Sequence, residues 1–259
     1  MTLRVMIAFA AAQLRGYLRE PLALGWTVFF PVLLLLILGT LDTSMPDRGT
    51  IDAETSGRER DRVFLLMGIV GMNVVSVGLF GLGLVLVQLR AIGFFRRLAL
   101  TPQPAGLFIA GQVFATAVVV VTTTLMLLAA GGLVFGVRPP ARPAQWSAFL
   151  VLGTGVFLGI GFALAATVRE TRTAHMLGNL AFLALVFLGG VWYPVHVLPG
   201  TLQRISLMLP LPHLLQALRE TALHGHDPVG LGHSASVLVG WLLATSLLAL
   251  LRFRWNDTR

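Results

Sequence analysis

The sequence predicts an all-α integral membrane protein with six transmembrane helices. Of its 259 residues, 56% are hydrophobic and 12% are charged, and the mean hydropathy is +0.84. Soluble domains carry about 25% charged residues, so this chain is too apolar for water. A helix that crosses the hydrocarbon core needs about 20 apolar residues. Six such stretches occur, at 22–41, 63–89, 107–134, 146–168, 174–193 and 231–251.

The first segment, residues 1–20, predicts an interfacial helix rather than a crossing. Arg4, Arg15 and Arg19 fall on one stripe of an otherwise apolar helix, which favours a position in the headgroup plane. Pro21 ends this helix and begins the first crossing. The alternative is a cleaved signal peptide with "VMIAFAAA" as its apolar core, which would place the arginine-rich loops on the outer side.

The distribution of arginine predicts the orientation. With both termini cytoplasmic, eleven arginines lie in inner segments and eight in outer segments, which agrees with the positive-inside rule. We therefore expect a multi-pass protein of the cell membrane with both termini in the cytoplasm. The net charge of +8 suits anionic lipid headgroups or an acidic protein partner, and it requires no nucleic acid.

Two absences limit the chemistry of the chain. All nineteen Lys+Arg residues are Arg, and there is no Cys. A P-loop needs a lysine on the phosphates and a Schiff-base enzyme needs an amine, so neither chemistry is available. Disulfides and thiolate metal ligands are excluded as well. We expect no cofactor to be bound by this chain itself.

The predicted crossings contain small residues and polar residues, and the role of each kind can be interpreted in two ways. A polar loop at 42–62 precedes a glycine-rich second crossing, where Gly71 and Gly78 favour close packing between helices of one chain over a subunit interface. Polar side chains within crossings either bond neighbouring helices or line a substrate path, and the sequence leaves both open. The candidate path residues are Asn73, Ser76, Gln112, Thr116, Thr123 and Asn179.

The loop after the second crossing, residues 90–106, is the first informative stretch. It reads "RAIGFFRRLALTPQPAG", a short amphipathic helix stopped by prolines at the cytoplasmic surface. This pattern resembles the permease subunits of type-2 ABC exporters, in which the corresponding coupling helix sits in a cleft of a separate ATPase subunit. The resemblance implies ATPase contacts at Arg90, Phe94, Phe95, Arg96, Arg97, Leu98, Thr101 and Pro102, with a second contact at Arg169, Glu170 and Arg172.

The second informative stretch, residues 194–230, follows "GGVWYP". It predicts two helices too short to cross, Thr201 to Leu209 and His213 to Leu223, which form an outer re-entrant pair. Permeases of the same family look similar here, and the matching residues are Trp192, Tyr193, Pro194, Pro199, Pro210 and Arg219. The resemblance covers 1–259 as one type-2 ABC transmembrane domain. It implies half of a dimeric pore, with ATP and Mg²⁺ on the partner ATPase subunit and an exported drug or lipid-like substrate, as in multidrug resistance.

Two rival functions remain. A zinc-dependent interfacial enzyme would use His224, His226 and His233 near "HGHDPVGLGH", although a glycine-rich loop with incidental histidines is the better interpretation. His196 and His213 read as interfacial loop residues. A secondary transporter is disfavoured, because such proteins keep carboxylates near the midplane and these crossings contain none.

Overall fold

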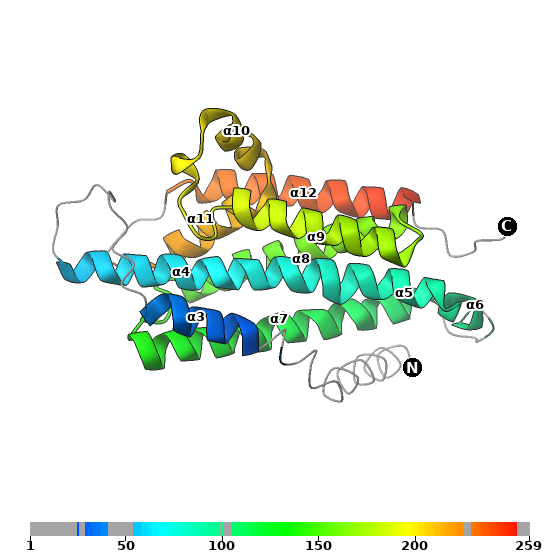
Figure 1. The fold of residues 1–259 in the computed structure, drawn as a ribbon, viewed down its shortest axis with the longest axis horizontal. Coiled ribbons are helices and arrows are strands. Elements are labelled where there is room, and N and C mark those ends of the chain that lie inside the picture. Colours follow the sequence, from blue (N-terminus) through cyan, green and yellow to red (C-terminus); the bar gives the residue numbers. More distant parts are fainter. Residues whose placement is uncertain are drawn as a thin grey trace.

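The computed structural model describes residues 29–40, 54–98, 105–224 and 229–252, together with Gly25 and Leu100. Within these residues every regular element is helical. Five helices are long and apolar enough to cross a membrane, and they run roughly along the long axis of the molecule (Figure 1). The predicted interfacial helix at 1–20 lies outside the described residues, and so do 22–24, 26–28 and 41 of the first predicted crossing. The helix described within that crossing is α3 (Phe30–Thr40), an apolar helix of 11 residues.

One continuous helical segment forms the centre of the bundle. It comprises α4 (Glu54–Ser76), the π-helix η2 (Val77–Leu84) and α5 (Val85–Ala91). The most apolar stretch of this segment is 83% buried, because α3, α7, α8, α9 and α11 all pack against the segment. Such burial leaves little of its surface for lipid, so the segment serves as the core against which the other crossings pack.

The remaining crossings surround this segment. They are α7 (Ala105–Phe135), α8 (Pro143–Thr167), α9 (Thr171–Leu188) and α12 (Leu231–Arg252). In the most apolar stretch of each helix, 56% is buried for α8 but only 33%, 22% and 17% for α7, α9 and α12. A helix with such a large exposed apolar surface requires lipid or another protein around it. The chain is therefore a multi-pass membrane protein.

The two short helices between α9 and α12 were expected from the sequence. The 3₁₀ turn η3 (Val195–Val197) leads into α10 (Gly200–Met208), which projects from the bundle, and α11 (Pro210–Ala222) packs back against α4, α8 and α12 (Figure 1). Ten of the 13 residues of α11 are buried. This helix is therefore part of the core, whereas α10 is mostly exposed.

Glycines let the central segment approach α8 very closely. A Cβ atom added at Gly78 would lie 2.7 Å from both the backbone carbon and the Cβ of Phe157, and one added at Gly83 would lie 2.8 Å from the carbonyl oxygen of Gly161. Any side chain at these positions would clash with backbone atoms. Packing between helices of one chain, the favoured interpretation of these glycines, is confirmed at this crossing.

Several predicted boundaries were wrong. Residues 54–62 continue α4 instead of belonging to the polar loop, and α9 ends at Leu188, five residues before the predicted end, because the chain turns at Gly190 with φ +77°. α11 begins at Pro210, since proline fits the first helical turn, where backbone N–H groups need no intrahelical partner. His213, predicted as the first residue of this helix and as an interfacial loop residue, therefore lies in the first turn of α11 and is buried, so its loop assignment was wrong.

Candidate coupling surface and polar core

A cluster of phenylalanines fixes the short helix of the predicted coupling loop. α6 (Phe94–Leu98) is only five residues long and follows Gly93, whose φ of +68° reverses the chain after α5. The rings of Phe94 and Phe95 lie 4.9 and 6.1 Å from that of Phe108 on α7. Phe95 and Leu98 are buried. The apolar side of α6 is thus packed onto the bundle, which leaves its other side as a surface.

The exposed surface formed by α6 and the residues next to it carries both positive charge and apolar side chains. Arg96 and Arg97 are exposed, and Arg97 Nη2 donates to the carbonyl oxygen of Ile92 at 3.4 Å. Ile92 and Leu100 are 63% and 88% exposed. Arginine beside exposed aliphatic residues is typical of a protein interface. Thr101 and Pro102, which the resemblance also assigns to this surface, lie outside the described residues.

The turn between α8 and α9 lies at the same end of the bundle as α6 (Figure 1). Arg90 Nη1 donates to the carbonyl oxygen of Ala165 near the end of α8, at 2.8 Å. Gln88 Nε2 and His175 Nε2 of α9 are 3.3 Å apart and share a hydrogen bond. Arg169, Glu170 and Arg172 are exposed on this turn. The structure therefore brings the two predicted ATPase contacts together, although they are more than 65 residues apart in the chain.

Most of the predicted substrate-path residues lie between the central segment and α7. Thr123 Oγ1 donates to Asn73 Oδ1 at 2.7 Å, and Gln112 Nε2 donates to the carbonyl oxygen of Gly81 at 3.2 Å. Thr116 donates to its own helix, at the Gln112 carbonyl oxygen. These four side chains are buried, and Ser76 is half-buried.

Their positions bear on the two interpretations of the sequence. Asn73 and Thr123 join two helices directly, and Gln112 satisfies a carbonyl group inside the π-helix, where the ordinary helical pairing is altered. Inter-helix bonding thus accounts for these three residues. Asn179 is apart from them and exposed on α9. A role of these residues in a substrate path remains a prediction.

Arg219 anchors the hairpin, meaning the helix pair α10 and α11, to the rest of the bundle. Its Nη2 donates to the carbonyl oxygens of Gly190 at 2.9 Å and Phe64 at 3.2 Å, and its guanidinium carbon lies 3.5 Å from the centre of the Phe64 ring. This arrangement ties α11 to α4 and to the turn after α9. The planar, stacking guanidinium is the side chain that can make all three contacts.

The other residues of the predicted re-entrant pattern form the turns around it. Tyr193 Oη donates to the carbonyl oxygen of Phe187 at 2.6 Å. Pro194 and Pro199 immediately precede η3 and α10, and Pro210 is the first residue of α11. Trp192 packs against the main core. The role of Trp241 could not be read from the sequence: its Nε1 donates to the carbonyl oxygen of Met208 at 3.0 Å, and nothing in a sequence links an indole to a distant backbone carbonyl.

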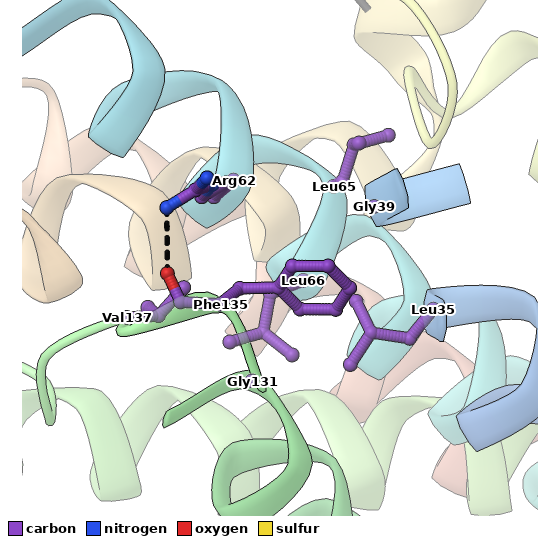
Figure 2. A pocket seen from close by; sticks show the side chains of 8 residues that line it. All are labelled: Leu35, Gly39, Arg62, Leu65, Leu66, Gly131, Phe135 and Val137. Carbon is purple, nitrogen blue, oxygen red and sulfur yellow. Dashed lines mark hydrogen bonds between the residues drawn. The ribbon is translucent and has the colours of Figure 1, made fainter. Parts of the chain in front are cut away.

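A small apolar pocket lies between α3, α4 and α7 (Figure 2). Its cavity volume is about 10 Å³, which is room for roughly one water molecule. Arg62 Nη1 donates to the carbonyl oxygen of Phe135 at its rim, at 2.7 Å. Pockets that enclose drug-sized ligands have about 300–1,000 Å³, so this one is too small for such a cargo. The lining residues are Leu35, Gly39, Arg62, Leu65, Leu66, Gly131, Phe135 and Val137.

The described residues contain no group of three or more His, Asp or Glu side chains placed to hold a metal ion. His224 and His233 are both exposed, while His226 lies outside the described residues. The zinc-enzyme hypothesis therefore gains no support from the part of the chain that is described.

Comparison with known proteins places the chain in a family. Residues 4–223 match the ABC-2 type transporter family, and the chain belongs to it. It is similar to "Putative transport permease YvfS" of Bacillus subtilis (strain 168), at 23% identity over 78% of this chain and 79% of that protein. It is also similar to the linearmycin resistance permease protein LnrN of the same organism, at 26% identity over 69% of this chain and 46% of that protein. The chain is thus a membrane permease of the ABC-2 type, a transporter rather than an enzyme.

Proposed function

We propose that this chain is the membrane-spanning subunit of an ATP-driven exporter in the cytoplasmic membrane, with both termini in the cytoplasm. A separate ABC ATPase subunit, which carries ATP and Mg²⁺, docks on the coupling surface, meaning α6 together with Arg169, Glu170 and Arg172. The observation that carries the proposal is the position of these segments at one end of the bundle, where the Arg90–Ala165 hydrogen bond joins α5, which precedes α6, to the end of α8. Family membership supports the same partner.

The coupling surface has the chemistry of a docking site. Its arginines are exposed, while the phenylalanines beneath them fix α6 against α7. A partner that pushes on α6 therefore moves α5 and α7 with it and cannot simply bend a loose loop. ATP-driven closure of the ATPase would tilt the crossings as rigid bodies and open a path toward the hairpin.

The proposed cargo is a hydrophobic or amphipathic molecule, drug-like or lipid-like, taken from the cytoplasm or inner leaflet. LnrN is a linearmycin resistance permease, and export of a toxic compound is one way in which a permease confers resistance. A second permease, identical or related, completes the pore. The large exposed apolar surfaces of α9 and α12 leave room for such a neighbour.

A charge reversal on α6 tests the proposal. Arg97→Glu should lower the affinity for an ABC ATPase encoded beside this chain by about tenfold or more, because an arginine at an interface is replaced by a repelled charge. Co-purification from detergent and ATP-dependent uptake of a lipophilic dye into inside-out vesicles measure the two consequences. The thermal stability of the permease alone should not change, since the Arg97 side chain is exposed.

The matched control is Arg138→Glu. Arg138 is also exposed, and its Nε lies 3.9 Å from Glu59 Oε1 in the second turn of α4, a helix that begins at the end of the bundle opposite α6 (Figure 1). This control should bind the ATPase as the unmodified chain does. Equal ATPase binding and transport by both variants would contradict docking at α6, and transport without any ATPase would contradict the proposed function as a whole.

A further inference from the structure

The contact between α11 and α12 brings two histidines together. The ring centroids of His213 and His233 are 5.2 Å apart, and the ring planes are inclined by 72°. His213 is only 3% exposed, whereas His233 is exposed. The sequence grouped His233 with the loop histidines 224 and 226, but its neighbour in the fold is His213, twenty residues away.

The hydrogen bonding of His213 fixes which nitrogen carries the proton. Its Nε2 lies 2.9 Å from the carbonyl oxygen of Leu207, and a carbonyl oxygen can only accept, so Nε2 is the N–H donor. In the neutral ring Nδ1 then carries a lone pair. This atom is buried and has no hydrogen-bond partner among the described residues. Histidines that bind metal ions are oriented in this way, with the second nitrogen donating to a backbone carbonyl.

The ring separation agrees with joint ligation of one ion. With metal–nitrogen distances of about 2.0–2.1 Å and a tetrahedral angle, two imidazoles on one zinc ion have centroids about 5 Å apart. Edge-to-face packing of two rings gives a similar distance. Packing alone, however, leaves Nδ1 of His213 buried and unsatisfied, which is rare in native proteins, whereas a metal ion would use its lone pair.

The chain offers few other nitrogen or sulfur ligands for such an ion. There is no cysteine, and the six histidines are His175, His196, His213, His224, His226 and His233. Among the described histidines, the rings of His213 and His233 are in contact with each other. Ser234, the residue after His233, has a buried hydroxyl without a hydrogen-bond partner among the described residues.

We propose that His213 and His233 form a two-histidine site for one Zn²⁺ ion, which links α11 to the first turns of α12 and is completed by water. Imidazole ligands suit zinc, copper and nickel, whereas Mg²⁺ and Ca²⁺ require oxygen ligands. The ion would hold the hairpin helix α11 against the last crossing. This site lies apart from the coupling surface, so it does not depend on the proposed export function.

The test uses the full chain in detergent, purified through a tag that contains no histidine. Equilibrium dialysis with Zn²⁺ should give one ion per chain, and the unfolding temperature should rise with Zn²⁺ but not with Mg²⁺ or Ca²⁺. His233→Ala should weaken binding by about tenfold or more. Because His233 is exposed, this variant should keep the fold, and His196→Ala, another exposed histidine, is the matched control.

A spectroscopic readout counts the ligands. Cu²⁺ bound in place of Zn²⁺ should show two coupled nitrogens by electron paramagnetic resonance in the unmodified chain and one in His233→Ala. Zinc binding that is unchanged in His233→Ala, or that is lost only when His224 and His226 are both replaced by alanine, would overturn the proposal. Absence of stoichiometric zinc binding would overturn it as well. None of these results bears on ATPase docking, which Arg97→Glu tests separately.

Discussion

Replacement of Gly78 by alanine tests the close approach of η2 to α8. The added Cβ would lie 2.7 Å from two atoms of Phe157, whereas ordinary van der Waals contact begins at 3.4 Å, so η2 and α8 would have to separate by about 0.7 Å. One of those two atoms is backbone, and Phe157 is fully buried, so neither can move aside alone. Overpacking of this kind costs about 1–3 kcal/mol.

Part of that cost is offset by the unfolded state. Glycine within a helix is about 0.5–1 kcal/mol less favourable than alanine, so the middle of the two ranges gives a net destabilisation of about 1 kcal/mol for Gly78→Ala. For a chain of this size each kcal/mol lowers the unfolding temperature by about 2–4 °C. Thermal unfolding in detergent, followed by light scattering or intrinsic fluorescence, measures this shift.

Gly240→Ala on α12 is the matched control. It makes the same chemical change within a helix, but a Cβ at Gly240 would meet no atom within 4 Å. Only the gain in helix propensity remains, so this variant should be stabilised by about 0.5–1 kcal/mol. The two substitutions thus have opposite predicted signs. If Gly78→Ala raised the unfolding temperature as Gly240→Ala does, the close approach of η2 to α8 would be refuted.

Three further predictions use the same unfolding measurement. A double-mutant cycle of Asn73→Leu and Thr123→Val should give a coupling energy of about 0.6–1.7 kcal/mol, and zero coupling would exclude their hydrogen bond. Arg219→Lys should cost about 1–3 kcal/mol, because lysine keeps the charge but not the paired contacts; the exposed Arg204→Lys should cost nothing measurable. Trp241→Phe should cost about 0.5–1.5 kcal/mol through loss of the bond to Met208, and an unchanged stability would argue against that bond.

Hydropathy predicted the existence of the long helices because it measures the property that places them in the membrane. α7, α8 and α12 begin and end within three residues of the predicted limits. The pattern of α11 was readable in part. Leu214, Leu215 and Leu218 are buried, and Gln216 on the other side is exposed, but Arg219 and Glu220, which the pattern places with Gln216, are half-buried. The short length of both hairpin helices followed from the prolines between them.

The tertiary partners of individual residues could not be predicted. The π-helical turns of η2 have the same apolar composition as an α-helix, and they can lie against α8 because Gly78 and Gly161 face that contact. Arg219 bonds to Phe64, which is 155 positions earlier in the chain. The local pattern placed His213 at the start of a helix, but its contact with His233 of α12, twenty residues later, could not be read from it.

The proposed function requires a connection between the coupling surface and the hairpin, which lie at different ends of the central segment. At one end, Arg90 of α5 is bonded to α8 beside the coupling surface, and at the other, the carbonyl oxygen of Phe64 in α4 accepts from Arg219 of the hairpin. Between them lies η2, whose pairing differs from that of the α-helices on either side. A rigid helix would carry a displacement of α6 to the hairpin, and a π-helical insertion is the place where such a helix can change its twist. On this reasoning the central segment, rather than the mostly exposed α9 or α12, is the element through which ATPase docking would reach the hairpin.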